Sequence, residues 1–180
     1  MSVTHEEVGD IISEIFLTDP LIDDNFVGFG LMDENYKAEV IIRLFTPESL
    51  NDSEPVRQAM QALLWFSHND GSRINLSVFS FIEILELRQR LQFELDWCDL
   101  TLVQPDKDTI EIGLYRAFDI TMNDIELARN KDLDSSFLRN LIRLKDEWVS
   151  LSPIFSGIAH KQIASLAGLE MLMREPTGIG

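Results

Sequence analysis

The residues of this chain that could carry out acid and base chemistry lie together in one polar turn. His68 and Asp70 are two residues apart in the sequence Ser-His-Asn-Asp-Gly, where an imidazole could serve as general base and a carboxylate could orient it. Cys98 or Tyr115 would have to converge on the same pocket to supply a nucleophile or an acid. Because a histidine in a polar loop is more often simply solvated, an enzyme with a site near His68 and Asp70 is an alternative hypothesis and not the favoured one.

The sequence contains no recognisable pattern for a metal or a cofactor. His5, His68 and His160 do not form the i, i+4 histidine pair of a zinc protease helix. The segment that begins at Asp106 starts like a calcium loop, but isoleucine and glutamate occupy the positions that require an oxygen ligand and a glycine. No glycine-rich phosphate loop or nucleophile elbow occurs. We therefore predict no catalytic residue, no cofactor and no metal.

Negative charge is distributed unevenly along the 180 residues, whose formal net charge is −16. Residues 1–60 carry 13 acidic and three basic side chains, and residues 61–130 carry 12 acidic and six basic ones. Residues 131–180 carry six of each sign. Since long-range fields follow net charge, the first two thirds should repel nucleic acid and anionic membranes and attract basic surfaces.

A cluster of carboxylates is the predicted docking surface for a basic protein partner. Three aspartates follow the first predicted helix, and two more acidic residues occupy a nearby hairpin tip, so together they form one candidate patch: Asp19, Asp23, Asp24, Asp33 and Glu34. Exposed aromatic anchors would supply most of the affinity, and the candidates for that role are Trp65 and Trp97.

Size and composition predict one folded domain. An apolar fraction of 45% with 11 Phe and three Trp is enough to build a sizeable core. The single cysteine excludes an intrachain disulfide, which fits a reducing compartment, and we expect a cytoplasmic protein. Neither a basic and apolar leader nor an apolar run of membrane-spanning length occurs in the sequence.

The pattern of apolar residues predicts an acidic α+β part over residues 1–130. Thr4 and Glu7 form a capping-box pattern ahead of the first helix, which should end before Pro20. Alternating apolar residues predict two hairpins, at 26–45 and 100–116, and a further strand at 73–80. Helical spacing predicts helices over about 53–66, 81–97 and 121–130, and Thr121 with Asp124 resembles a weaker cap for the last of these.

The rest of the chain reads as a neutral helical part over 131–174 with a frayed tail at 175–180. One helix should cover 137–149, and Ser152 with Pro153 should start another that runs to about 173. The sequence therefore predicts a single α+β domain over 1–180, with about five strands in a mainly antiparallel sheet (two hairpins plus one strand) and a three-helix C-terminal segment.

The last predicted helix has apolar and small residues on more than one side. It is either a core helix or the seam of a homodimer, and the core reading is favoured about two to one. The residues assigned to self-association in the second reading are Phe155, Ile158, Ala164 and Gly168.

The predicted function is that of a non-enzymatic acidic protein-binding module of the chaperone, immunity-protein or adaptor type. The element order partly resembles the secretion-chaperone fold, in which a few helices pack on a twisted antiparallel sheet. The helix expected at about 53–66 and the long helical tail depart from that fold, so no residue roles are transferred. The alternative is a DNA mimic, whose carboxylates would follow one face at roughly 6 to 7 Å spacing.

Overall fold

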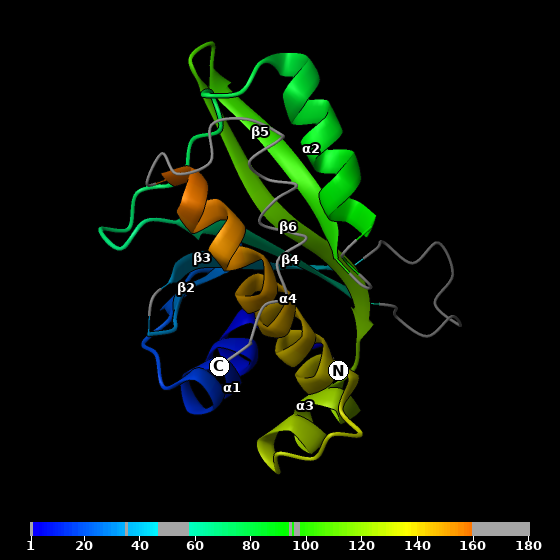
Figure 1. Cartoon of the computed structure of the whole chain (residues 1–180). Helices are drawn as coiled ribbons and strands as arrows, with labels where there is room; N and C mark the ends of the chain where they lie inside the picture. The colour runs from blue at the N-terminus through cyan, green and yellow to red at the C-terminus, as the bar shows by residue number, and fades with distance from the viewer. Residues whose placement is uncertain (1, 35, 47–57, 94, 96–97, 160–180) are drawn as a thin grey trace, which may run out of the picture.

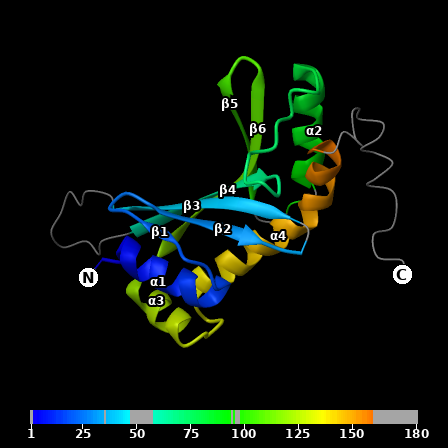
Figure 2. The ribbon, with the colours of Figure 1, turned by 90° about the vertical axis from the view of Figure 1, so that its left-hand side faces the viewer.

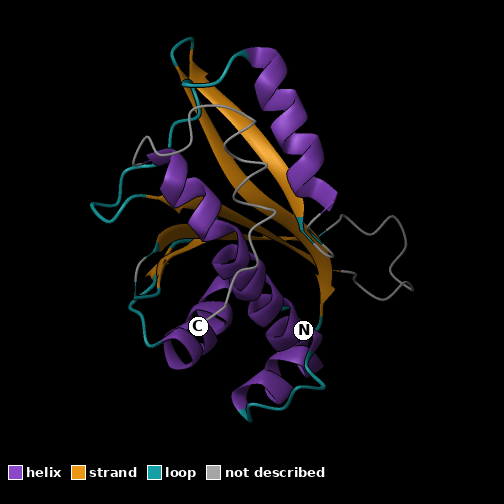
Figure 3. Ribbon diagram, in the orientation of Figure 1, coloured by secondary structure: helices purple, strands orange, loops and turns teal. Residues whose placement is uncertain are grey.

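The computed structural model describes residues 2–34, 36–46, 58–93, 95 and 98–159 (Figure 1). Within these residues the fold is α+β, with four helices and a six-stranded antiparallel sheet, which confirms the predicted class (Figure 3). The elements are, in chain order, α1 His5–Phe16, β1 Leu21–Ile22, β2 Val27–Met32, β3 Lys37–Phe45, β4 Gln58–Ser67, α2 Phe81–Phe93, β5 Asp99–Asp106, β6 Thr109–Ile120, α3 Met122–Arg129 and α4 Ser136–Ala159.

The strands are arranged in the order β1-β2-β3-β4-β6-β5, and every neighbouring pair is antiparallel. The chain runs as a meander from β1 to β4, then passes through α2 to the outer strand β5 and returns inside it as β6. Helices α1, α3 and α4 cover one face of the sheet, while α2 lies beside the β5–β6 hairpin (Figure 2).

Alternation along the strands decides which side chains enter the core. Val40 and Ile42 of β3 point to the helix-covered face and are fully buried, as is Leu64 of β4. Ile12 of α1 and Trp148 of α4 fill the same core from the other side. Both predicted hairpins are confirmed as β2–β3 and β5–β6, because their alternation was clear enough to specify one buried face.

The helix predicted over 53–66 is wrong where the structure describes it. Gln58–Ser67 is instead strand β4, paired with β3 on one side and β6 on the other. Apolar residues occupy both faces of this strand, so the sequence lost the period-two signal and also fitted helical spacing. Residues 53–57 lie outside the described part of the chain.

The strand predicted over 73–80 is also wrong. The segment forms only two isolated bridges, Ser67 with Arg73 and Asn75 with Glu111. Ile74 and Leu76 are buried, as the alternation suggested, yet both sides of β4 are already occupied by other strands. The described part of the sheet loses this strand but gains two that the sequence did not predict, β4 and the two-residue β1, and so has six strands and not five.

Two helices predicted after residue 136 are one helix, α4. It runs through Pro153, which cannot donate a backbone hydrogen bond to the preceding turn. The neighbouring Ser152 hydroxyl donates to the Trp148 carbonyl at 2.6 Å, and Trp148 and Phe155 bury the helix on both sides of the proline. Burial therefore overrides the local preference to stop. Residues 160–173 lie outside the described residues.

The capping boxes are confirmed in both places where they were predicted. The Thr4 hydroxyl accepts from the Glu7 amide, and the Glu7 carboxylate accepts from the Thr4 amide. Thr121 and Asp124 make the same reciprocal pair at the start of α3. These short-range patterns fix where α1 and α3 begin, because each satisfies donors that a helix start leaves free.

We predict that Gly113→Ala destabilises the fold by about 1 to 3 kcal/mol. A Cβ at this position in β6 would stand 2.5 Å from the backbone oxygen of Leu64 in the neighbouring strand, and backbone cannot move aside cheaply. The matched control is Gly30→Ala in β2, whose Cβ would meet its nearest atom, the Ala38 oxygen, at an ordinary 3.8 Å. Urea unfolding should leave Gly30→Ala as stable as the parent or slightly more so. Equal losses for the two variants would contradict the close approach of β4 and β6.

Candidate functional site

A cleft of about 680 Å³ lies where the N-terminal segment, the start of α1, the β1–β2 turn and the end of β3 meet. Its walls combine carboxylates with aliphatic side chains. The lining residues are Ser2, Val3, Thr4, His5, Glu6, Ile22, Asp23, Asp24, Leu44, Thr46 and Gln58.

Hydrogen bonds to side chains hold the cleft together. The buried amide of Gln58, at the start of β4, accepts from the Val3 N–H and donates to the Val3 carbonyl, both at 2.7 Å. Nε2 of His5 accepts from the Leu44 N–H at 3.2 Å, which ties the first turn of α1 to β3. The floor of the cleft is therefore anchored to the sheet at two points.

The rim of the cleft is negative. Glu6, Asp23 and Asp24 are exposed. Asp23 accepts hydrogen bonds from the backbone and side-chain N–H groups of Asn25, which fixes the turn that presents both aspartates. Burial lowers the pKa of His5, against the opposing influence of Asp23 and Asp24, so the imidazole is uncharged at neutral pH. The rim keeps its negative charge.

Such a cleft suits a cationic side chain with an aliphatic stem. Ile22 and Leu44 offer apolar surface inside the carboxylate rim, and the neighbouring Leu21 and Phe45 are exposed. Lysine and arginine carry their charge at the end of an apolar stem, so they can use both kinds of surface. The chemistry fits a basic peptide segment that also carries apolar residues.

The predicted acidic patch is two patches. Asp23 and Asp24 precede β2, whereas Asp33 and Glu34 follow it, so the length of that strand, roughly 17 Å, separates the pairs. This exceeds the distance of about 8 Å over which salt screens exposed charges. Asp19 is exposed between α1 and β1 and does not line the cleft. Of the five predicted carboxylates, the cleft brings together only Asp23 and Asp24, and adds Glu6.

The expectation of an exposed anchor at Trp65 is wrong. Trp65 is 5% exposed, and the Arg73 guanidinium covers its ring at 4.7 Å. Arg73 also pairs with Glu39 at 3.4 Å and with Glu111 at 3.0 Å. Trp65 therefore supports the open face of the sheet and is not available to a partner. Trp97 lies outside the described residues.

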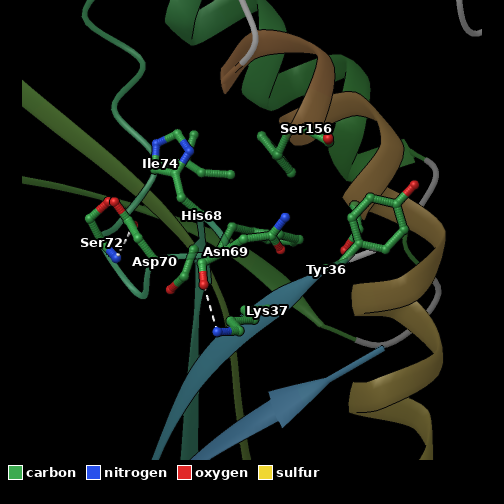
Figure 4. A pocket seen from close by; sticks show the side chains of 12 residues that line it. Tyr36, Lys37, His68, Asn69, Asp70, Ser72, Ile74 and Ser156 are labelled. Carbon is green, nitrogen blue, oxygen red and sulfur yellow. Dashed lines mark hydrogen bonds between the residues drawn. The ribbon is translucent and has the colours of Figure 1, made fainter. Parts of the chain in front are cut away.

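The His68–Asp70 turn borders a second cavity, of about 370 Å³ (Figure 4). The Asp70 carboxylate accepts from the backbone N–H and the hydroxyl of Ser72, bonds that lower its pKa, and it does not orient His68. Tyr115 lines a different cleft, beside α2, and Cys98 lines neither cavity. The cavity therefore brings His68 and Asp70 together without Cys98 or Tyr115.

Cys98 is buried beside α4. Its backbone N–H donates to the Glu147 carboxylate at 2.9 Å. Burial raises the pKa of the Cys98 thiol far above its ordinary value, and a separate hydrogen bond of the thiol itself with the Glu147 side chain acts in the same direction. A thiol held in its protonated form is a poor nucleophile, which agrees with a structural role.

Of the residues assigned to self-association, the structure describes the side chain of Phe155 alone, and it does not lie on the surface. Phe155 is fully buried and packs on Phe66, with ring centroids 4.3 Å apart. It belongs to the core because α4 continues through Pro153 and stays against the sheet. The side chain of Ile158, and Ala164 and Gly168, lie outside the described residues.

An exposed apolar face on α2 escaped the sequence analysis. Phe81 is 72% exposed, Ile82 69% and Leu85 45%, while the opposite face buries Ile84 and Leu87. The sequence does contain this feature, because apolar residues occur on both sides of the helix. Only the side with Ile84 and Leu87 was assigned to the core. This face of α2 offers exposed apolar side chains for an interaction.

Over the described ranges, no group of three histidine, cysteine, aspartate or glutamate side chains is placed to hold a metal ion. In the same ranges, no helix is long and apolar enough to cross a membrane. Comparison with protein-family models, with curated proteins and with solved structures finds no match. The geometry of the chain is therefore the basis for its functional assignment.

We predict that Cys98 reacts with a thiol reagent such as DTNB at least about 100-fold more slowly than an exposed cysteine at pH 8, because so little of it is thiolate. The reference is Cys98→Ala combined with Ser77→Cys, which places the only thiol at an exposed position. In strong denaturant both proteins should react at the same rate. Similar rates in the folded proteins would show that Cys98 is accessible.

Proposed function

We propose that this protein is a non-enzymatic protein-binding module of the chaperone type, and that the cleft at the start of α1 receives a basic segment of a protein partner. The observation that carries the proposal is the cleft itself, with Glu6, Asp23 and Asp24 around an aliphatic interior. Charge complementarity of this kind accelerates encounter and selects against acidic partners. The apolar interior would slow dissociation.

The corrected strand order supports the chaperone type over an immunity protein or an adaptor. One of the two departures from the secretion-chaperone fold was the helix expected at about 53–66, and over 58–66 that segment is strand β4. Apart from the short β1, the chain therefore runs through one helix, three strands, one helix, two strands and two further helices. The long α4 remains a departure. A cytoplasmic location belongs to the same proposal, and the free, buried Cys98 is compatible with it.

We place self-association on α2 and not on α4. Glu83 and Glu86 lie in the first half of α2, and Arg88 and Arg90 in the second half. Two copies of α2 packed antiparallel about a two-fold axis would set the acidic half of each, which carries the exposed Phe81, Ile82 and Leu85, against the basic half of the other. A second copy of this chain therefore fits the face in both polarity and charge.

A DNA mimic is the second candidate, favoured by one feature of α1. Glu6, Asp10 and Glu14 are exposed at i, i+4 and i+8, so they form a row with steps of about 6 Å. That spacing is close to the phosphate separation expected for a mimic. Like charges at this spacing destabilise a helix slightly, so the row does not serve the stability of α1.

Reversing two rim charges should weaken partner capture by about tenfold or more. The variant Glu6→Lys with Asp24→Lys leaves Asp23, which holds the turn, in place. The control Asp19→Lys with Glu34→Lys changes the net charge equally but outside the cleft. Proteins that co-purify from the source organism at about 50 and 300 mM salt are quantified by mass spectrometry for the parent and both variants.

A basic protein that is retained by the parent and the control but lost from the cleft variant would support the proposal. Loss of the same protein from both variants would mean that overall charge, and not the cleft, governs binding. Capture of several nucleic-acid-binding proteins that duplex DNA displaces would favour the mimic.

Sedimentation velocity should detect a dimer of the parent, and Ile82→Asp with Leu85→Asp should make it monomeric, because carboxylates would be buried in the seam. Leu133→Asp is the control, since Leu133 is 59% exposed in the loop before α4. Glu86→Arg alone and Arg88→Glu alone should each weaken the dimer. The two substitutions combined should restore it. A monomeric parent at about 100 μM, a concentration that populates dimers of micromolar affinity, would remove α2 as the seam.

A further inference from the structure

The cavity beside His68 has the dimensions and the two-sided lining of a small-molecule site. It measures about 370 Å³, within the range of roughly 300 to 1,000 Å³ for ligand pockets. Three parts of the chain that are distant in sequence form it: the start of β3, the end of β4 with the following turn, and the last described turns of α4. It lies at the opposite end of β4 from the acidic cleft, so it is a separate site.

One wall of the cavity is apolar. Phe66, Ile74 and Phe155 line it, and each is at most 4% exposed. The Phe66 and Phe155 rings are packed against each other across the junction of β4 and α4. This wall can accommodate the hydrocarbon part of a ligand.

The other wall carries donors and cations. His68 lies on one side and Tyr36 on the other, with Asn69 and Lys37 below them and Ser156 above (Figure 4). The Lys37 ammonium donates to the Asn69 carbonyl at 2.5 Å and keeps two further N–H groups. In a chain of net charge −16, this concentration of donors is unusual.

Two further observations indicate that the cavity suits a ligand with a hydrogen-bond acceptor. The Ser67 hydroxyl is buried without a hydrogen-bond partner, in a residue that is 9% exposed and lines the cavity. A buried polar atom without a partner is destabilising, and a bound acceptor that the hydroxyl can reach would remove this cost. Asp70 is the acidic residue of the lining, and its carboxylate is already turned to Ser72 in its own turn.

We propose that this cavity is a binding site for a small organic carboxylate with an apolar body. The carboxylate would accept from Lys37 and, once the Ser67 side chain turns toward the cavity, from its hydroxyl, and the apolar body would contact the small exposed parts of Phe66 and Ile74. Nucleophilic chemistry is not required of the site. Its role is binding, and it does not depend on the partner proposed for the acidic cleft.

The test uses phenylacetate and its neutral isostere phenylacetamide as probes, followed by ¹H–¹⁵N NMR of the full chain. Phenylacetate should shift amide signals of residues 36–37, 66–74 and 152–156, and should bind at least about tenfold more tightly than the amide, as expected for one charge-assisted hydrogen bond. Lys37→Met and Ser67→Ala should each weaken phenylacetate binding. Lys107→Met, at the exposed β5–β6 turn, should not.

Equal binding of the acid and the amide would overturn the assignment, and that comparison requires no variant. Shifts confined to residues outside the cavity, or no shifts at millimolar phenylacetate, would overturn it as well. Weakening by Lys107→Met equal to that by Lys37→Met would show that only the general charge of the protein was sensed.

Discussion

The structure depends on the pairing of β4 on both of its edges. β3 and β6 flank it in antiparallel register, and its side chains are buried on the helix-covered face and at least partly buried on the other. Backbone groups in this position have no access to water, so both neighbours must stay in place. The approach of β6 is close enough that Gly113 faces the Leu64 oxygen without room for a methyl group. The helices on one face and the Arg73–Trp65 contact on the other then pack on a sheet whose centre is fixed.

Each end of β4 builds a candidate site. At its first residue, Gln58 holds the N-terminal segment and thereby the acidic cleft. At its last residues, Phe66 and Ser67 line the cavity beside His68. The strand spans ten residues, so the two sites are about 30 Å apart, several screening lengths at physiological salt. A negative cleft and a cavity rich in donors can therefore coexist in one small protein, because neither field reaches the other.

Local sequence patterns predicted much of the fold. The errors lie where packing in the folded chain outweighs local preference. The capping residues Thr4 and Thr121 located two helix starts because their hydrogen bonds are made within three residues. Strand β4 was predicted as a helix because apolar residues on both of its faces hide the alternation of a strand. Pro153 was predicted to start a new helix, but the packing of Trp148 and Phe155 outweighs the lost backbone hydrogen bond, and α4 continues. For the cleft, the sequence supplied Asp23 and Asp24 but not Glu6 or Ile22, since only the folded chain brings α1 against β1. For the cavity beside His68, the sequence indicated only His68 and Asp70, as part of the alternative enzyme hypothesis. Its other lining residues could not be read from the sequence, because Ser67, Lys37 and Phe155 come from three elements.

The two proposed protein contacts reinforce one another physically. A two-fold dimer through α2 leaves both acidic clefts free, because α2 lies beside β5 while the cleft lies among α1, β1 and β3. A single contact dissociates faster than two contacts made together, since the exposed rim charges add little affinity to that of the apolar interior. A partner with two basic segments that engages both clefts makes its second contact intramolecularly, at an effective concentration in the millimolar range when the linker spans the sites. Selectivity would then depend on the spacing of basic segments as well as on their charge, and a single basic segment would exchange freely. By this means the strongly negative chain would bind a small number of basic proteins firmly. Its charge would repel nucleic acid and anionic surfaces.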